Sequence, residues 1–302
     1  MAAMIAAQYG LGATVTGIFH PIGYAKVLMQ VGFEPLPPQP SVSLFGKEQW
    51  VYPNIFKYIG HIKKVDGFWG LYRGVFPRVL SGTIGNVVQN NLMDAFKESN
   101  KRPKEIAPMD HEDQLMEWAK EFCKETSQET IARCVGLIIG HPFHVIMLRG
   151  MIQFVGRESK YDSIFSSIAE IYRNDGILGY FAGLFPRLIG EIITVWITNF
   201  LAQLINKYLV HEKDMQSYTA ASCGLFVSYV TYPYILVSNI MAVNGSGLEA
   251  SSPPRMPRYE SSLDCWNSLR AQNQLKRGSS LFWRYYTGHT RLGSEYSYYS
   301  KY

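Results

Sequence analysis

Five long stretches of apolar and glycine residues alternate with polar connections along the chain. They cover residues 4–31, 76–96, 131–155, 185–210 and 218–243. Each holds about the 20 residues that an α-helix needs to cross a bilayer, and each is nearly free of charge. The pattern predicts a helical membrane protein with several spans. A mean hydropathy of -0.06 leaves open an all-helical globular protein with unusually glycine-rich helices.

The stretches belong to internal repeats. DGFWGLYRGVFPRVL begins at Asp66 and DGILGYFAGLFPRLI begins at Asp175. Upstream motifs that also resemble one another begin at His20 (HPIGYAKVLMQVG), His141 (HPFHVIMLRGMIQFVG) and Thr231 (TYPYILVSNIMAV). Each unit therefore reads as a helix, a connection, a glycine-rich turn and a second helix, which neighbouring units must cover.

The third unit is incomplete. Its turn survives only as KRGSSLFWR over residues 276–284, and the tyrosine-rich tail that follows is too short and polar for another apolar helix. We expect repeat 1 over 1–97, a charged connecting loop over 98–130, repeat 2 over 131–210 and an incomplete repeat 3 over 211–302. The connection over 98–129 could also be a surface helix. Residues 259–275 could form an amphipathic helix with Leu263, Trp266 and Leu269 on one face.

Prolines and glycines mark the architecture of the repeats. A proline inside each first helix predicts a kink, and an Asp-Gly pair predicts a turn with Asx bonding and positive φ at glycine. A Pro-Arg pair predicts the first turn of each second helix, with arginine reaching toward lipid headgroups. These residues are Pro21, Pro142 and Pro233, Gly67 and Gly176, and Pro77, Arg78, Pro186 and Arg187.

Composition excludes several classes of function. The net charge of +5 is spread out, which argues against a nucleic-acid partner. The four cysteines form no CxxC pair, which indicates reduced thiols. Because nucleotide-binding loops and hydrolase motifs are absent, we expect no catalytic residue, no enzyme activity and no cofactor. His141 and His144 lie three apart, but without further ligands a structural role is favoured over a metal site.

The predicted second helices carry polar stripes that cannot comfortably face lipid. One stripe runs through Arg78, Gly82, Asn86, Gln89, Asn90 and Met93, and another through Glu191, Thr198 and Ala202, flanked by Asn199 and Gln203. The first helix of repeat 2 adds Arg133, Gly136, Gly140 and His144. Such groups either bond between helices, at about 0.6 kcal/mol each, or line a wet groove. Both readings stay open.

Glu191 is the single residue that is most informative about function. An ionised side chain near the bilayer centre costs roughly 2.5 to 3.5 kcal/mol on insertion scales, so it should have water, a proton or a partner. Arg133, Lys26 and Arg149 are candidate partners. A structural ion pair near a helix end is an equal alternative to a role in a groove.

The repeats resemble the mitochondrial carrier family, whose three repeats make a six-helix bundle. In that family each first helix carries a proline, an acid two residues later and bases five and seven residues later. Repeat 1 keeps Pro21 and Lys26, but Gly23 stands for the acid and Leu28 for the second base.

Repeats 2 and 3 are also eroded. Pro142 and Arg149 remain, while His144 and Met147 stand for the acid and the first base, and only Pro233 survives in repeat 3. Acids and bases at these positions are thought to close the carrier pore in a ring of ion pairs. A ring with almost no acid cannot close in that way.

A narrower resemblance is carried by HPFHVI, IQFVGRESKY, FAGLFPRL, YPYILVSNIMAVN and GFEPLPP, and it covers nearly the whole chain. These strings are similar to the mitochondrial carrier homologues, a divergent branch of the family. The resemblance implies a multi-pass protein of the mitochondrial outer membrane without a demonstrated solute. It also implies roles in inserting helical membrane proteins and in receiving pro-apoptotic proteins.

The predicted fold is therefore an all-α membrane protein, a carrier-like helical bundle of three repeats whose third lacks its second transmembrane helix. We hypothesise a polar groove that opens sideways to lipid and accepts client transmembrane helices, including tail-anchored ones. The expected lining is Lys26, Asn86, Gln89, Asn90, Arg133, His144, Glu191, Thr198, Asn199 and Gln203. The rival hypotheses are a solute carrier, and a receptor or scaffold for apoptosis-related proteins that docks partners on its loops.

Overall fold

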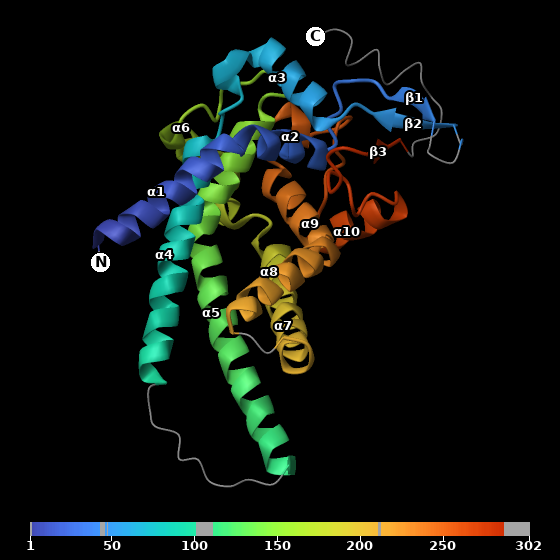
Figure 1. The fold of residues 1–302 in the computed structure, drawn as a ribbon. Coiled ribbons are helices and arrows are strands. Elements are labelled where there is room, and N and C mark those ends of the chain that lie inside the picture. Colours follow the sequence, from blue (N-terminus) through green and yellow to red (C-terminus); the bar gives the residue numbers. More distant parts are fainter. Residues whose placement is uncertain (1, 43–45, 47, 101–110, 211–212, 287–302) are drawn as a thin grey trace.

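The computed structural model describes residues 2–42, 46, 48–100, 111–210 and 213–286. Within these ranges the chain is mostly helical, with one small sheet (Figure 1). The helices are α1 (Ala2–Ile18), α2 (His20–Gln30), α3 (Ile55–Gly70), α4 (Val75–Ser99), α5 (His111–Ile152), α6 (Ile164–Asp175), α7 (Leu184–Tyr208), α8 (Lys213–Val230), α9 (Tyr232–Val243) and α10 (Ser262–Ala271), with 3-10 turns η1 (Ile177–Phe181) and η2 (Glu249–Ser251). The strands are β1 (Gln39–Val42), β2 (Glu48–Tyr52) and β3 (Arg284–Tyr285).

Each of the five apolar stretches is helical, but the prolines act in two ways. The first stretch is broken into α1 and α2, and the fifth into α8 and α9, with a bend of 59° in the latter. Pro21 and Pro233 lie in the first turn after each break, where a proline costs no helix hydrogen bond. Pro142 lies inside α5, which continues through it. A proline thus lies in the first helix of each repeat, as predicted, but that helix is broken only in repeats 1 and 3.

Helices suited to a membrane are present. In the part of the chain that the structure describes, Leu115–Ile152 and Ile177–Tyr208 are long and apolar enough to cross a bilayer, and the bent pair α8–α9 could form a third span. Helix α4 has 25 residues, which is long enough, but its polar side chains lower its hydropathy. The count of five spans therefore stays a prediction.

Helix α5 decides between the loop and the helix predicted for 98–130, because residues 111–130 are helical, and residues 101–110 lie outside the described ranges. It starts at His111 and runs for 42 residues, which corresponds to about 63 Å at 1.5 Å per residue. Its amino-terminal part lies against α7, where the Phe122 ring is 6.0 Å from Trp196 and 6.2 Å from Phe200 between centroids. This contact covers the Phe122 ring, which is 8% exposed. In Figure 1 this end of α5 extends beyond α4.

One turn geometry recurs in all three repeats. The residue before the repeat proline binds the carbonyl of the residue before a glycine with positive φ. The bonds are His20 Nε2 to Arg73 O (2.9 Å), His141 Nε2 to Ala182 O (3.0 Å) and Tyr232 Oη to Arg277 O (2.7 Å), and the glycines are Gly74 (φ 80°), Gly183 (φ 75°) and Gly278 (φ 76°). The structural role predicted for the histidines is confirmed, and the degraded third motif still folds as a turn.

The turns bring together the buried core. Its side chains come mainly from α2, the carboxyl-terminal half of α5, and α9, and they include Tyr24, Leu148 and Leu236. We call this region the closed end of the bundle. The predicted positive φ is found at Gly67 (74°) and Gly176 (67°), and Pro77 and Pro186 lie within the first turns of α4 and α7.

The third turn leads into a strand where the other two lead into helices. β3 pairs antiparallel with β2, and β2 with β1, in a three-stranded sheet that the sequence did not predict. Arg284 of β3 binds the Glu34 carboxylate at 3.0 and 2.6 Å. Burial raises the pKa of the Glu34 carboxyl to about 7, and the positive charges of Arg284 and Arg277 oppose that rise. The residues after 286 lie outside the described ranges.

The amphipathic helix predicted over 259–275 exists as α10, but its faces differ from the prediction. Leu269 is fully buried and Trp266 packs on Tyr234 with centroids 5.0 Å apart, whereas Leu263 is 74% exposed. Leu263 therefore does not share the buried face of Leu269. Cys265, which is fully buried, occupies the buried position that was predicted for Leu263.

Candidate functional site

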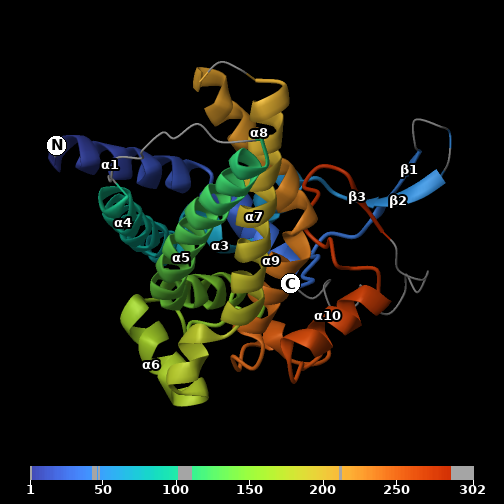
Figure 2. The same cartoon turned by 90° about the horizontal axis from the view of Figure 1, so that it is seen from below.

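A polar groove lies between α1 and α4, with a volume of about 430 Å³. From α4 it is lined by Asn86 and Asn90, as predicted, together with residues that share the same helix face. The full lining is Tyr9, Gly12, Ala13, Thr16, Arg78, Val79, Gly82, Thr83, Asn86 and Asn90. We call this feature the α1–α4 groove. In Figure 2, α1 lies beside α4 at the edge of the bundle, away from α9 and α10.

Among the described residues, one side-chain bond links the two walls of the groove. Asn90 Nδ2 donates to the Tyr9 hydroxyl oxygen at 3.2 Å. Asn86 is exposed and makes no side-chain hydrogen bond to another described residue. The amides are therefore available to a further hydrogen-bonding group, which is the property that distinguishes a wet groove from a dry helix interface.

Another side of α4 makes a close backbone contact with α5. A Cβ placed on Gly136 would lie 2.5 Å from the Gly85 carbonyl oxygen, and one on Gly140 would lie 2.7 Å from the Ser81 oxygen. Small residues of this kind let membrane helices approach closely. Gln89 borders this contact, since its Cβ is 3.4 Å from the Gly136 position. Gln89 was predicted to line the groove, and the structure places it at the helix interface.

Glu191 finds its partner in Arg133, one of the three candidates. Arg133 Nη1 lies 3.1 Å from Glu191 Oε1, and its Nε and Nη2 each lie 2.9 Å from Glu129 Oε1. Asn199 Nδ2 donates to Glu129 Oε2 at 2.7 Å. Four groups from α5 and α7 thus form one half-buried network. Three predicted groove residues are engaged with one another and not with an open space.

Arg149, another candidate partner, is used elsewhere. It is fully buried, its Nη2 lies 2.7 Å from Asp175 Oδ2, and its Nε donates to the Ala242 carbonyl at 3.1 Å. The equivalent acid in repeat 1, Asp66, pairs with Arg73 at 3.1 Å. The carboxylates of both Asp-Gly turns therefore hold ion pairs, for which the sequence had predicted Asx bonding.

Lys26 and His144 lie at the closed end. His144 Nε2 is 3.1 Å from Asn239 Oδ1, and Asn239 Nδ2 donates to Gln30 Oε1 at 2.8 Å. Gln30 Nε2 donates to the Tyr232 hydroxyl at 2.9 Å. The Lys26 ammonium lies over the Tyr232 ring, 5.2 Å from its centroid. Uncharged groups from all three repeats thus form the contact that an ion-pair ring makes in the resembling carriers.

Thr198 lies on the side of α7 that meets α8, and Gln203 is a further partly buried residue of α7. Thr198 Cγ2 would touch a Cβ placed on Gly224 of α8 at 3.7 Å, and Thr198 Oγ1 and Gln203 Oε1 are buried without a hydrogen-bond partner among the described residues. The ten predicted lining residues are therefore divided among the α1–α4 groove, the Glu191 network, the closed end and the helix interfaces. Only Asn86 and Asn90 line the groove.

Arg78, the first residue of the predicted polar stripe, lines the groove, and its reach toward headgroups stays a prediction. Its guanidinium lies against Gly23 of α2, so closely that a side chain at Gly23 would displace it. Gly23 stands where the family motif has an acid, and that substitution was the sequence signal. Gly190 is a similar contact in repeat 2, where a Cβ would meet Tyr234 Cβ at 2.7 Å.

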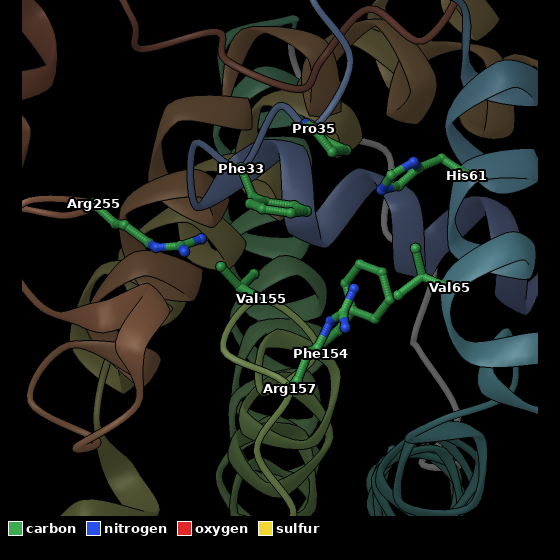
Figure 3. A pocket seen from close by; sticks show the side chains of 8 residues that line it. All are labelled: Phe33, Pro35, His61, Val65, Phe154, Val155, Arg157 and Arg255. Carbon is green, nitrogen blue, oxygen red and sulfur yellow. The ribbon is translucent and has the colours of Figure 1, made fainter. Parts of the chain in front are cut away.

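A second pocket lies at the closed end and has a volume of only about 30 Å³. Figure 3 shows His61 and Arg157 approaching it beside the rings of Phe33 and Phe154. Burial lowers the pKa of His61, and the charges of Lys64 and Arg157 lower it further. This volume accommodates about two water molecules, which excludes a metabolite-sized ligand.

Metal chemistry has no support in the described part of the chain. It contains no group of three or more His, Cys, Asp or Glu side chains that could hold an ion. The four cysteines are free thiols. The geometry therefore describes a site that binds through polar side chains.

Comparisons with known proteins agree with the repeat motifs. The family model "Mitochondrial carrier protein" matches residues 2–103 and 121–213. The chain is 45% identical to Mitochondrial carrier homolog 2 of Homo sapiens over 284 residues, which cover 92% of this chain and 93% of that protein. It is 39% identical to Mitochondrial carrier homolog 1 of Mus musculus over 296 residues, which cover 91% and 75%. Solute carrier family 25 member 45 of Mus musculus is 28% identical over 150 residues, 46% of this chain and 50% of that protein.

Proposed function

The chain belongs to the mitochondrial carrier family, and from this premise we propose that it helps α-helical proteins, including tail-anchored ones, to insert into the outer mitochondrial membrane. It is a mitochondrial membrane protein of carrier type. The observation that carries the proposal is the α1–α4 groove, which presents amides and hydroxyls on a helix that would otherwise face lipid.

The groove addresses the main physical obstacle to insertion. A polar or charged flank of an incoming helix loses its water in the bilayer core, and an amide without a partner costs several kcal/mol there. Asn86, Asn90 and Thr83 offer replacement partners along α4. The apolar part of the same client could contact lipid throughout, because α1 lies at the edge of the bundle (Figure 2).

The closed end argues against alternating access, which a solute carrier requires. In the resembling carriers, ion pairs that form and break provide two states. Here the equivalent region holds the neutral bonds of Asn239 with His144 and Gln30 beside the internal ion pair of Arg149 with Asp175. Asn239, Gln30 and Arg149 are buried, so breaking these contacts would leave buried polar groups without partners. A single stable state suits a fixed groove.

The amino-terminal part of α5 favours a second candidate, a receptor for soluble partners such as pro-apoptotic proteins. Leu115 is 60% exposed and Met116 is 54% exposed on this extension, beside acidic residues. Exposed apolar side chains on a helix that extends beyond its neighbours suit a docking role. Exchange of residues 111–117, which leaves Phe122 and its contacts with α7 in place, should abolish such docking and leave insertion intact.

The insertion proposal is tested in vesicles that contain the full chain and a fluorescent tail-anchored client. Asn86→Leu with Asn90→Leu should lower the insertion rate about sevenfold, if each amide supplies the average 0.6 kcal/mol of a membrane hydrogen bond. Asn267→Leu is the matched control, because Asn267 is exposed on α10 far along the chain from the groove. Equal rates for all three proteins would refute the proposal.

A further inference from the structure

The inner end of the α1–α4 groove carries an uncompensated positive charge. Arg78 lines the groove and is half-buried, and no acidic side chain among the described residues pairs with it. Its guanidinium lies against Gly23, where a carboxylate would be the natural partner. Lys26 is three residues further along α2, on the same side of that helix, and lies close enough for its charge to repel that of Arg78.

Four acids that lie between the helices of the bundle are already engaged. Glu191 and Glu129 bind Arg133, Asp175 binds Arg149, and Asp66 binds Arg73. None of these pairs includes Arg78 or Lys26. Among the described residues, Arg78 in the groove and Lys26 beside it on α2 therefore have no acidic partner, although charge inside a membrane is costly without one.

We propose that Arg78, assisted by Lys26, receives the C-terminal carboxylate of a tail-anchored client, and this rests on the proposed insertion function. Asn90 and Arg78 are twelve residues apart on α4, or about 18 Å along its axis. A client entering at the Asn90 end would bring its leading group to Arg78 last. That leading group is a carboxylate in every tail-anchored helix, and an arginine fork matches a carboxylate with two parallel hydrogen bonds.

A lipid phosphate is the competing occupant, but the position of Arg78 favours the carboxylate. The guanidinium lies against α2 at one end of a groove lined by amides and hydroxyls. A groove with amides along its length and a cation at its inner end provides for a polar group that travels along it. The structure thus assigns to Arg78 the last contact that the client terminus makes before it leaves the groove.

The test uses one synthetic tail-anchored client made in two forms, with a free C-terminal carboxylate or with a carboxamide. Both are presented to phosphatidylcholine vesicles that hold the full chain. Arg78→Gln should slow insertion of the carboxylate form about tenfold, in line with the loss of a charge-assisted bond. The same substitution should change insertion of the carboxamide form less than about twofold.

Gly23→Asp keeps Arg78 and supplies an internal carboxylate beside it, so it should cause the same selective loss. The flexible end of Arg78 can move aside to admit the new side chain. Gly23→Asn is the matched control of equal size without charge and should keep the preference for the carboxylate form. Thermal unfolding in detergent identifies any variant whose loss is a folding defect.

Three outcomes overturn the proposal. Equal loss for both client forms, or loss for neither, would show that Arg78 does not read the carboxylate. Equal loss together with a phospholipid that copurifies with the native chain and not with Arg78→Gln would assign the site to lipid phosphate. Native chain that inserts neither form faster than empty vesicles would refute the insertion function itself, and a selective loss would support both proposals.

Discussion

The two ends of the bundle treat polar side chains in opposite ways. At the closed end, Gln30, Asn239 and Tyr232 are buried and bound to one another. In the α1–α4 groove, Asn86 and Arg78 have no side-chain partner among the residues described. The same residue types thus hold three repeats together in one place and remain available to a ligand in the other. Burial and pairing, not residue type, separate structure from function here.

Repeats 1 and 2 show how the closed end conserves its ion pairs. Repeat 2 pairs Asp175 with Arg149 of the first helix, and repeat 1 pairs Asp66 with Arg73 of the turn. The positions are exchanged, because Leu28 is equivalent to Arg149 and Ala182 to Arg73. Each acid therefore keeps one arginine, although the arginine comes from a different place in the motif.

Loss of Arg149 should have the largest effect at the closed end. Arg149→Leu would leave the Asp175 carboxylate and the Ala242 carbonyl without their partner, and breaking a buried ion pair from one side costs about 3 to 5 kcal/mol. Thermal or chemical unfolding in detergent measures the change. Arg78→Gln, which removes no internal bond, should change the free energy of unfolding by less than about 0.5 kcal/mol.

The exchange of arginines between repeats supplies a rescue. Arg149→Leu combined with Ala182→Arg copies the arrangement of repeat 1 into repeat 2 and should recover about half of the lost free energy, as expected for coupled neighbours. A double variant no more stable than Arg149→Leu would contradict the equivalence of the two ion pairs.

The neutral network should be the next most sensitive feature. Asn239→Leu would leave His144 and Gln30 with unpaired polar atoms and should destabilise the protein by about 2 to 4 kcal/mol. Asn86→Leu, the groove counterpart, should cost close to nothing in stability while slowing insertion. Comparable losses of stability for the two leucine variants would erase the distinction between the two ends.

A smaller effect is expected at the contact of α4 with α5. Gly136→Ala would place a methyl group 2.5 Å from the Gly85 carbonyl oxygen and should cost about 1 to 3 kcal/mol through overpacking. Gly82→Ala, on the groove side of α4, is the control, because a Cβ at Gly82 meets nothing within 4 Å. A destabilised Gly82→Ala would mean that the groove is packed shut.

Much of the fold could be predicted from local signals. The starts of α4 and α7 follow from Pro77 and Pro186, and the positive φ of Gly67 and Gly176 follows from the Asp-Gly turns. These signals act over a few residues, where backbone sterics decide the conformation. The α5 extension was harder to predict, because Phe122 packs on Trp196 of a helix far away in the sequence, which no local pattern indicates.

The candidate site was predicted less completely for the same reason. A polar stripe on one helix does not say which neighbour covers it, so Gln89 was grouped with Asn86 although the two face different partners. Arg78 was placed on the same stripe, but nothing near it in sequence marks Gly23 as its neighbour. The sheet of β1, β2 and β3 joins segments more than 200 residues apart, which no local pattern indicates.

The sequence by itself determined the repeats, the family, the turn glycines and the absence of an ion-pair ring, since each of these is a matter of residue type at a given spacing. Tertiary structure alone decided which polar groups meet. It paired Glu191 with Arg133 and Arg149 with Asp175, and it placed Arg78 in the groove. The physical reason is that hydrogen bonds and ion pairs act over a few ångströms in space, whatever the distance along the chain.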